Sequence, residues 1–160
     1  MRTPANIAGY PIHPMLVAIP IGLWVFSLVC DFIAMRSGTP ELWTGIAYWT
    51  LIGGIVGALA AALPGLIDLL SLEDPAIKKT ALTHMGINLA VVALYVLNGV
   101  LRYRDPQGIG GVPFALSVLA ILMLLVSGWL GGKMVYLARV GVTDAPESTV
   151  RAKAPEFRNR

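Results

Sequence analysis

Long apolar stretches separated by short polar segments dominate this chain. The segments from Thr80 to Leu101 and from Pro106 to Gly132 carry no charged residue at all. Crossing the hydrocarbon core of a bilayer takes about 20 mainly apolar residues. The pattern therefore predicts four membrane-spanning helices, at about 14–35, 43–67, 80–101 and 113–137.

The polar segments define the domain organisation. Charged residues, glycine and proline interrupt the apolar pattern at 36–41, 71–75 and 102–111, where we expect the connections between helices. Residues 143–160 carry charges and two prolines with little apolar surface, which predicts a flexible cytoplasmic tail. The fold class is thus all-α, an integral membrane four-helix bundle over residues 1–142 followed by this tail.

Composition and charge agree with this class and give it an orientation. Of all residues, 56% are hydrophobic and 13% charged, too few charges for the surface of a soluble enzyme. With four spans, nine lysines and arginines fall on the side of the termini and three on the other. The cytoplasmic loops of membrane proteins carry an excess of Lys and Arg, so this bias predicts that both termini lie in the cytoplasm, on the inner side of a bacterial inner membrane. The basic residues thus reflect topology, and we expect no binding to nucleic acid.

Two helix faces stand out. In the second span Gly53, Gly57, Ala61 and Gly65 follow at four-residue spacing, so that either another helix or a flat ligand can approach closely. In the third span a polar stripe should face inward, because polar groups facing lipid lose their hydrogen bonds. Its members are His84, Asn88, Val91, Tyr95 and Asn98.

Ionisable residues at membrane depth are costly and are therefore candidate sites. His13, Asp68 and His84 should share one leaflet, because the first and third spans begin there and the second ends there. Asp31 should lie at the opposite face, where an ion pair with Arg36, Arg102 or Arg104 is expected. Cys30 alone cannot form an internal disulfide or a thiolate metal site.

The chemistry of these residues leaves three interpretations open. Imidazoles from two helices can hold the two axial positions of a haem iron, with Asp68 orienting one of them. A divalent metal could bind His13, His84 and Asp68. Alternatively these residues form a purely structural hydrogen-bonded cap, in which His13 bonds to Asp68 or a carbonyl and His84 bonds to Asn88 or Tyr136.

Several motifs also match a known family in order and spacing. They are the segments 12–17 and 19–22, the segment 63–68, His84 with Asn88, and the segment 131–136. From about Pro11 to Gly141 the chain resembles the bacterial membrane family catalogued as domain of unknown function 2231.

The resemblance implies a four-helix membrane protein similar in layout to membrane cytochromes that hold b-type haem between histidines. Some relatives are joined to Rieske-type iron–sulfur domains. The family's histidines fall on His13 and His84 and its acid on Asp68, whereas many relatives have a further histidine where this chain has Ala18.

We therefore expect an electron-transfer or accessory membrane protein rather than a stand-alone enzyme, with one haem b between His13 and His84. In this hypothesis Asn88 and Tyr136 surround the ligands and Lys133 pairs with a propionate. The expected partners are the bilayer, an iron–sulfur or other redox protein, the quinone pool and a second copy of the chain. The alternatives are a non-catalytic membrane scaffold and a metal-binding or proton-coupled carrier of small solutes.

Overall fold

Four span-length helices make up the computed structural model, which describes residues 3–106 and 110–142. The helices long and apolar enough to cross a membrane confirm the predicted fold class; they are Ile12–Ala34, Pro40–Leu70, Pro75–Arg104 and Gly111–Leu137. The elements in chain order are β1 (Asn6–Ile7), β2 (Tyr10–Pro11), α1 (Ile12–Leu16), α2 (Ala18–Ala34), α3 (Pro40–Leu70), α4 (Pro75–Arg104) and α5 (Gly111–Tyr136).

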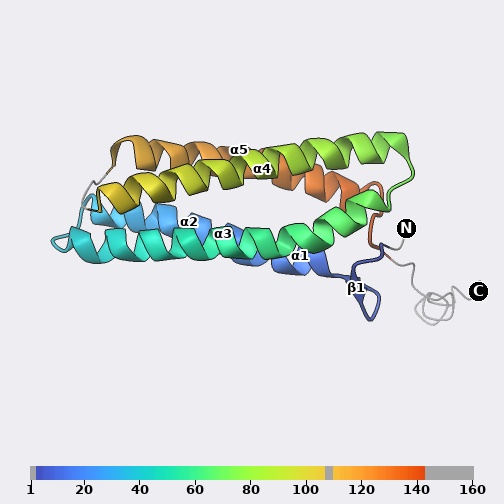
Figure 1. Cartoon of the computed structure of the whole chain (residues 1–160), viewed down its shortest axis with the longest axis horizontal. Coiled ribbons are helices and arrows are strands. Elements are labelled where there is room, and N and C mark those ends of the chain that lie inside the picture. Colours follow the sequence, from blue (N-terminus) through green and yellow to red (C-terminus); the bar gives the residue numbers. More distant parts are fainter. Residues whose placement is uncertain (1–2, 107–109, 143–160) are drawn as a thin grey trace, which may run out of the picture.

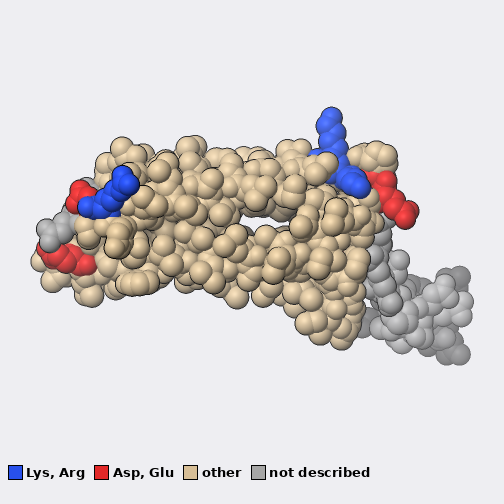
Figure 2. All heavy atoms as spheres, in the orientation of Figure 1, with Lys and Arg blue, Asp and Glu red and all other residues tan. Residues whose placement is uncertain are grey.

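The helices form two antiparallel hairpins that lie one against the other. Helices α2 and α3 make the first hairpin and α4 and α5 the second, with all four along one axis (Figure 1). We call the end that holds His13 and His84 the histidine end, and the end that holds Asp31 and Arg102 the ion-pair end. In Figure 2 the visible charged side chains lie at these two ends, with an uncharged surface between them. This distribution is what a protein crossing a bilayer requires.

The first span is broken near its start. The short helix α1 ends at Leu16 and α2 begins at Ala18. Proline lacks a backbone N–H and its ring crowds the carbonyl four residues earlier, so Pro20 leaves the Leu16 carbonyl without its helical partner. The break lies at this position and separates the turn that carries His13 from the rest of the span.

Helix α4 begins earlier than its apolar stretch. Asp74 caps it by accepting hydrogen bonds from the backbone N–H groups of Ala76 and Ile77, at 2.7 and 3.1 Å, and Pro75 occupies the first turn. Both features favour a helix start. The helix therefore runs from Pro75 to Arg104, beyond the predicted 80–101, and its first turns precede the uncharged segment.

The core joins both hairpins at mid-length. Trp24 stacks on Tyr95 with ring centroids 4.3 Å apart, and its indole N–H donates to the Leu51 carbonyl at 3.2 Å. A Cβ at Gly54 would collide with the Trp24 indole, which explains the glycine. The buried cluster consists of Trp24, Leu51, Val91, Tyr95 and Ala120.

The small face of α3 packs against the first span. A Cβ at Gly53 would come within 3.3 Å of Leu23, and one at Gly57 within 3.3 Å of Ile19 and Pro20. At Gly53 and Gly57 this face is therefore used for close packing of another helix, which was one of its two expected uses; the other was binding of a flat ligand.

Candidate functional site

His13 is held by helix α3. It lies in α1, half-buried, and its Nδ1 lies 2.8 Å from the Ala61 carbonyl oxygen. Gly65 lies one turn after Ala61, and a Cβ there would come 2.7 Å from the same Nδ1. The absence of a side chain at Gly65 thus lets the imidazole reach the helix backbone.

His84 is held in the same way by helix α5. Its Nδ1 lies 2.9 Å from both the carbonyl oxygen and the Oγ of Ser127. Gly131 follows one turn later, and a Cβ there would come 3.4 Å from the His84 ring. Asn88 completes the surroundings: its Nδ2 lies 3.1 Å from His84 Nε2 and donates to the His84 carbonyl at 2.9 Å.

The two imidazoles face one another across the hairpins. Their ring centroids are 6.4 Å apart and their planes are inclined by 88°. A carbonyl oxygen can only accept a hydrogen bond, so Nδ1 of each ring carries the proton and donates it. Nε2 of His84, which faces the Asn88 amide donor, therefore bears a lone pair, the form in which histidine ligates a metal.

Asp68 contacts the segment that precedes α1. Its Oδ1 accepts a hydrogen bond from the backbone N–H of Ala5 at 2.9 Å. The carboxylate thereby fixes the short β1–β2 hairpin, which leads directly into the turn of His13. Its link to His13 in the structure runs through the backbone of this segment, whereas the Ala61 carbonyl orients the ring.

Lys133 and Tyr136 lie together at the surface of α5. They line an open pocket of about 340 Å³ with Trp129, Gly132 and Leu137. The Lys133 ammonium lies 5.8 Å from the Trp129 ring centroid, and the Tyr136 side chain is 83% exposed. Of the predicted site residues, the structure brings His13, His84 and Asn88 together and gives Asp68, Lys133 and Tyr136 other contacts.

A three-ligand divalent site is not formed in this arrangement. Within residues 3–106 and 110–142, no three His, Cys, Asp or Glu side chains lie close enough together to hold a metal ion. A carbonyl was among the expected partners of His13 and Asn88 among those of His84, but neither the Ala61 nor the Ser127 carbonyl was identified from the sequence. The available signal was a small residue four positions before a glycine, which occurs at both Ala61–Gly65 and Ser127–Gly131.

The expected ion pair at the other end is present, with Arg102 as the partner. Its Nη1 and Nη2 donate to the two carboxylate oxygens of Asp31 at 2.7 and 2.6 Å. Its Nε donates to Asn98 Oδ1 at 2.8 Å, and Asn98 in turn donates to the Pro113 carbonyl and to Ser117 Oγ, each at 2.8 Å.

The fold and its buried polar groups define a four-span integral membrane protein with an imidazole pair near one end. The family model described as a predicted membrane protein (DUF2231) matches residues 9–144, and the chain belongs to this family. No curated protein and no solved structure matches the chain.

Proposed function

We propose that the protein binds one b-type haem between His13 and His84 and transfers electrons within the membrane. The observation that carries the proposal is the imidazole pair, because the rings come from different hairpins and each directs its protonated Nδ1 at a backbone carbonyl. A metal–imidazole bond is about 2.0 Å long, which places the centres of two axial rings about 6 Å apart across an iron. The 6.4 Å between the centroids fits this separation.

The relative orientation of the two rings also supports the proposal. Ring planes inclined by 88° are compatible with two imidazoles that stand on opposite faces of one macrocycle. Binding requires the Asn88 amide to give up its contact with His84 Nε2, while its bond to the His84 carbonyl can remain.

Each protein group has a role in this proposal. A bound haem supplies reversible one-electron transfer. His13 and His84 hold it, and the carbonyls of Ala61 and Ser127 fix the tautomer and strengthen the ligands. Asp68 positions His13 through Ala5. Lys133, at the same end, is the candidate partner of a propionate.

The membrane context of the proposal is a bacterial inner membrane with both termini in the cytoplasm. Among the basic residues that support this orientation, Lys78 and Lys79 near the start of α4 and Lys133 near the end of α5 lie at the histidine end. Electrons would then pass between a redox protein at this face, of the iron–sulfur or another type, and the quinone pool.

An absorption spectrum tests the proposal. Protein purified in mild detergent from haem-replete cells should show a near-stoichiometric Soret band and, after reduction, sharp α and β bands. His84→Ala and His13→Ala should each abolish the spectrum while helical content is retained. Thr83→Ala changes the exposed neighbour of His84 and is the matched control. A folded parent protein without haem, or a full haem complement in His84→Ala, would overturn the assignment.

A structural lock is the competing function, and the hydrogen bonds give it a specific argument. Both ring nitrogens of His84 already have partners within the protein. In a non-catalytic scaffold this cluster would hold the helices together, and His84→Ala would lower the thermal stability without removing any cofactor. The spectrum and the stability of the same variant therefore separate the two functions.

A further inference from the structure

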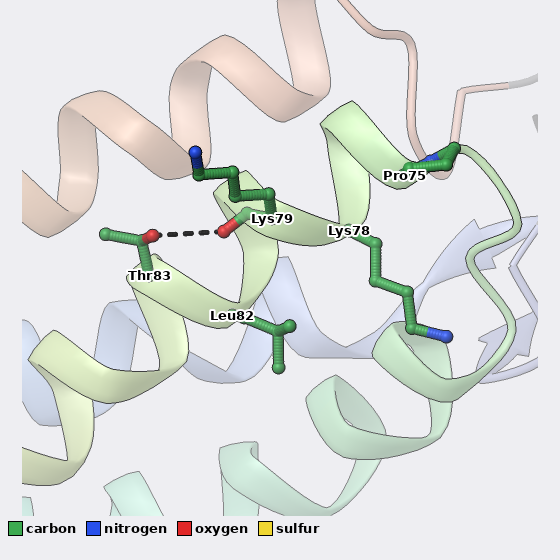
Figure 3. A pocket seen from close by; sticks show the side chains of 5 residues that line it. All are labelled: Pro75, Lys78, Lys79, Leu82 and Thr83. Atoms are coloured by element: carbon green, nitrogen blue, oxygen red, sulfur yellow. Dashed lines mark hydrogen bonds between the residues drawn. The ribbon is translucent and has the colours of Figure 1, made fainter.

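An open pocket of about 500 Å³ lies at the start of α4, at the histidine end. It is lined by Pro75, Lys78, Lys79, Leu82 and Thr83. In Figure 3 the two lysines diverge, Lys79 toward α5 and Lys78 toward α3, with Leu82 between them. The pocket thus combines two cationic heads with an apolar wall.

The two ammonium groups have no anionic partner in the part of the chain that the structure describes. Neither forms an ion pair there, and the nearby Asp74 carboxylate accepts hydrogen bonds from two backbone N–H groups of the first helical turn. Both lysines also lie near the positive end of the α4 dipole, which disfavours cations. An anion from outside the chain would pair with the two ammonium groups and would offset their unfavourable interaction with the helix dipole.

The position of the pocket relative to the bilayer indicates which anion. The lysines lie at the start of the span Pro75–Arg104, at the level where lipid headgroups are expected. Leu82 follows one turn deeper and is 48% exposed, so its side chain faces the acyl region. Long basic side chains near the end of a span reach the interface with their charged heads while their stems cover apolar surface.

The neighbouring helix repeats the pattern at the same end. On α5, Lys133 lies beside the exposed rings of Trp129 and Tyr136 in the second pocket. Tryptophan and tyrosine are enriched at the membrane–water interface. These rings independently indicate that this end of the bundle lies at headgroup level.

We propose that the pocket at the start of α4 binds an anionic phospholipid, with its phosphate headgroup at the level of Lys78 and Lys79 and an acyl chain along Leu82. The site is distinct from the imidazole pair, so it stands or falls independently of haem binding. The recognised chemistry is a phosphate ester joined to an apolar chain at the membrane surface.

Native mass spectrometry of the detergent-purified protein tests the site. Phosphatidylglycerol and phosphatidylcholine are titrated separately, and inorganic phosphate is the third probe. We expect one phosphatidylglycerol to bind more tightly than phosphatidylcholine, and millimolar inorganic phosphate not to bind, because it lacks the apolar chain. In K78Q/K79Q the affinity for phosphatidylglycerol should fall on the order of 20-fold, since each basic residue near an anionic membrane surface contributes about fivefold.

Two further variants keep the outcome interpretable. K78R/K79R conserves the charges and should retain the preference. R104Q removes an exposed basic residue at the opposite end of α4 and should leave the affinity unchanged. The proposal is overturned if the parent binds both lipids equally, if K78Q/K79Q keeps its preference, or if inorganic phosphate displaces the lipid. An equal loss in R104Q would show attraction by overall charge and would overturn it as well.

Discussion

The two ends of this molecule join its hairpins in opposite ways. At the ion-pair end Asp31 of α2 accepts two hydrogen bonds from Arg102 of α4, so charged groups connect one hairpin directly to the other. At the histidine end each imidazole bonds to a carbonyl within its own hairpin. The rings of His13 and His84 then meet across the hairpins by an edge contact.

This difference has an energetic meaning. Helices in a bilayer have no hydrophobic drive to associate, since lipid tails are as apolar as their side chains. A paired charge buried between hairpins therefore holds them, because separating it would leave each ion without a partner. An edge contact between two rings costs far less to open. The ion-pair end is therefore the more firmly closed of the two; under the haem proposal, it is the histidine end that parts to admit a flat group.

The largest expected effect is the loss of the Arg102 guanidinium. Arg102→Met leaves the Asp31 carboxylate buried without its partner, and removing one member of a buried pair costs about 3–5 kcal/mol of unfolding free energy. Equilibrium unfolding in mixed micelles measures this. The exposed Arg104→Met is the control and should change little. If Arg102→Met is as stable as this control, the pair does not hold the hairpins.

Replacing both partners sharpens the same test. In Asp31→Leu/Arg102→Met no charge is left unpaired, and such replacements are often neutral or stabilising. We expect the double variant to recover most of the lost stability. A double variant as unstable as Arg102→Met would mean that the loss comes from Asn98, which Arg102 Nε also contacts.

At the histidine end the next largest effect should follow from Gly65→Ala. The new Cβ would lie 2.7 Å from His13 Nδ1 and must displace the ring from the Ala61 carbonyl. Overpacking of this kind costs about 1–3 kcal/mol. Gly128→Ala, where a Cβ meets open space, is the matched control, and thermal unfolding compares the two. Under the haem proposal Gly65→Ala also lowers haem occupancy, which Gly128→Ala should not.

Sequence patterns predicted the ion-pair end and the core better than they predicted the histidine end. The apolar stretches predicted the spans, and helical spacing placed Val91, Tyr95 and Asn98 in the interior, where all three are fully buried. Charge and depth were sufficient to pair Asp31 with an arginine, because no other way to bury that carboxylate is cheap. Opposite charges attract over distance, so their pairing can be inferred without knowing how helices rotate.

The contact of His84 with Asn88 was within reach of this reasoning, but the particular carbonyls that the two histidines contact were not. Any helix carbonyl is a possible acceptor, and which one an imidazole reaches depends on how closely two helices approach. That approach is set by the missing side chains at Gly65 and Gly131. The same holds for Asp68, whose partner is a backbone N–H sixty-three residues away in sequence. Such contacts follow from tertiary packing. The small residue four positions before a glycine does not single them out, because Gly53–Gly57 has the same spacing and packs against Ile19 and Pro20.

Between the two ends, Tyr95 offers a test of the core. Its hydroxyl is buried and has no hydrogen-bond partner in the described residues. Leaving a buried polar group unpaired costs about 1–3 kcal/mol, so Tyr95→Phe should raise the unfolding free energy by about 1 kcal/mol while the stack on Trp24 remains. A clear loss of stability, measured by thermal unfolding, would show that the hydroxyl is bound by a water molecule or ligand. Trp24 fluorescence reports whether the stack is preserved.

The smallest effects should come from two buried serines, one at each end. Ser127→Ala removes the hydroxyl beside His84 but keeps the backbone carbonyl that receives the Nδ1 proton. Ser117→Ala removes one acceptor of Asn98 but keeps the Pro113 carbonyl. Each should cost about 0.5–1.5 kcal/mol, the usual contribution of one hydrogen bond.

The haem spectra of the two serine variants also test whether the Ser127 hydroxyl affects the His84 ligand. If the carbonyl alone sets the tautomer of His84, Ser127→Ala keeps the parent's haem spectrum and lowers only the unfolding temperature, as Ser117→Ala does. A shifted reduction potential or a lost Soret band in Ser127→Ala, with the spectrum of Ser117→Ala unchanged, would assign the hydroxyl a part in tuning the ligand. Equal spectral changes in both variants would instead mean that the ends are coupled through the bundle, and that the histidine end does not open independently of the ion pair.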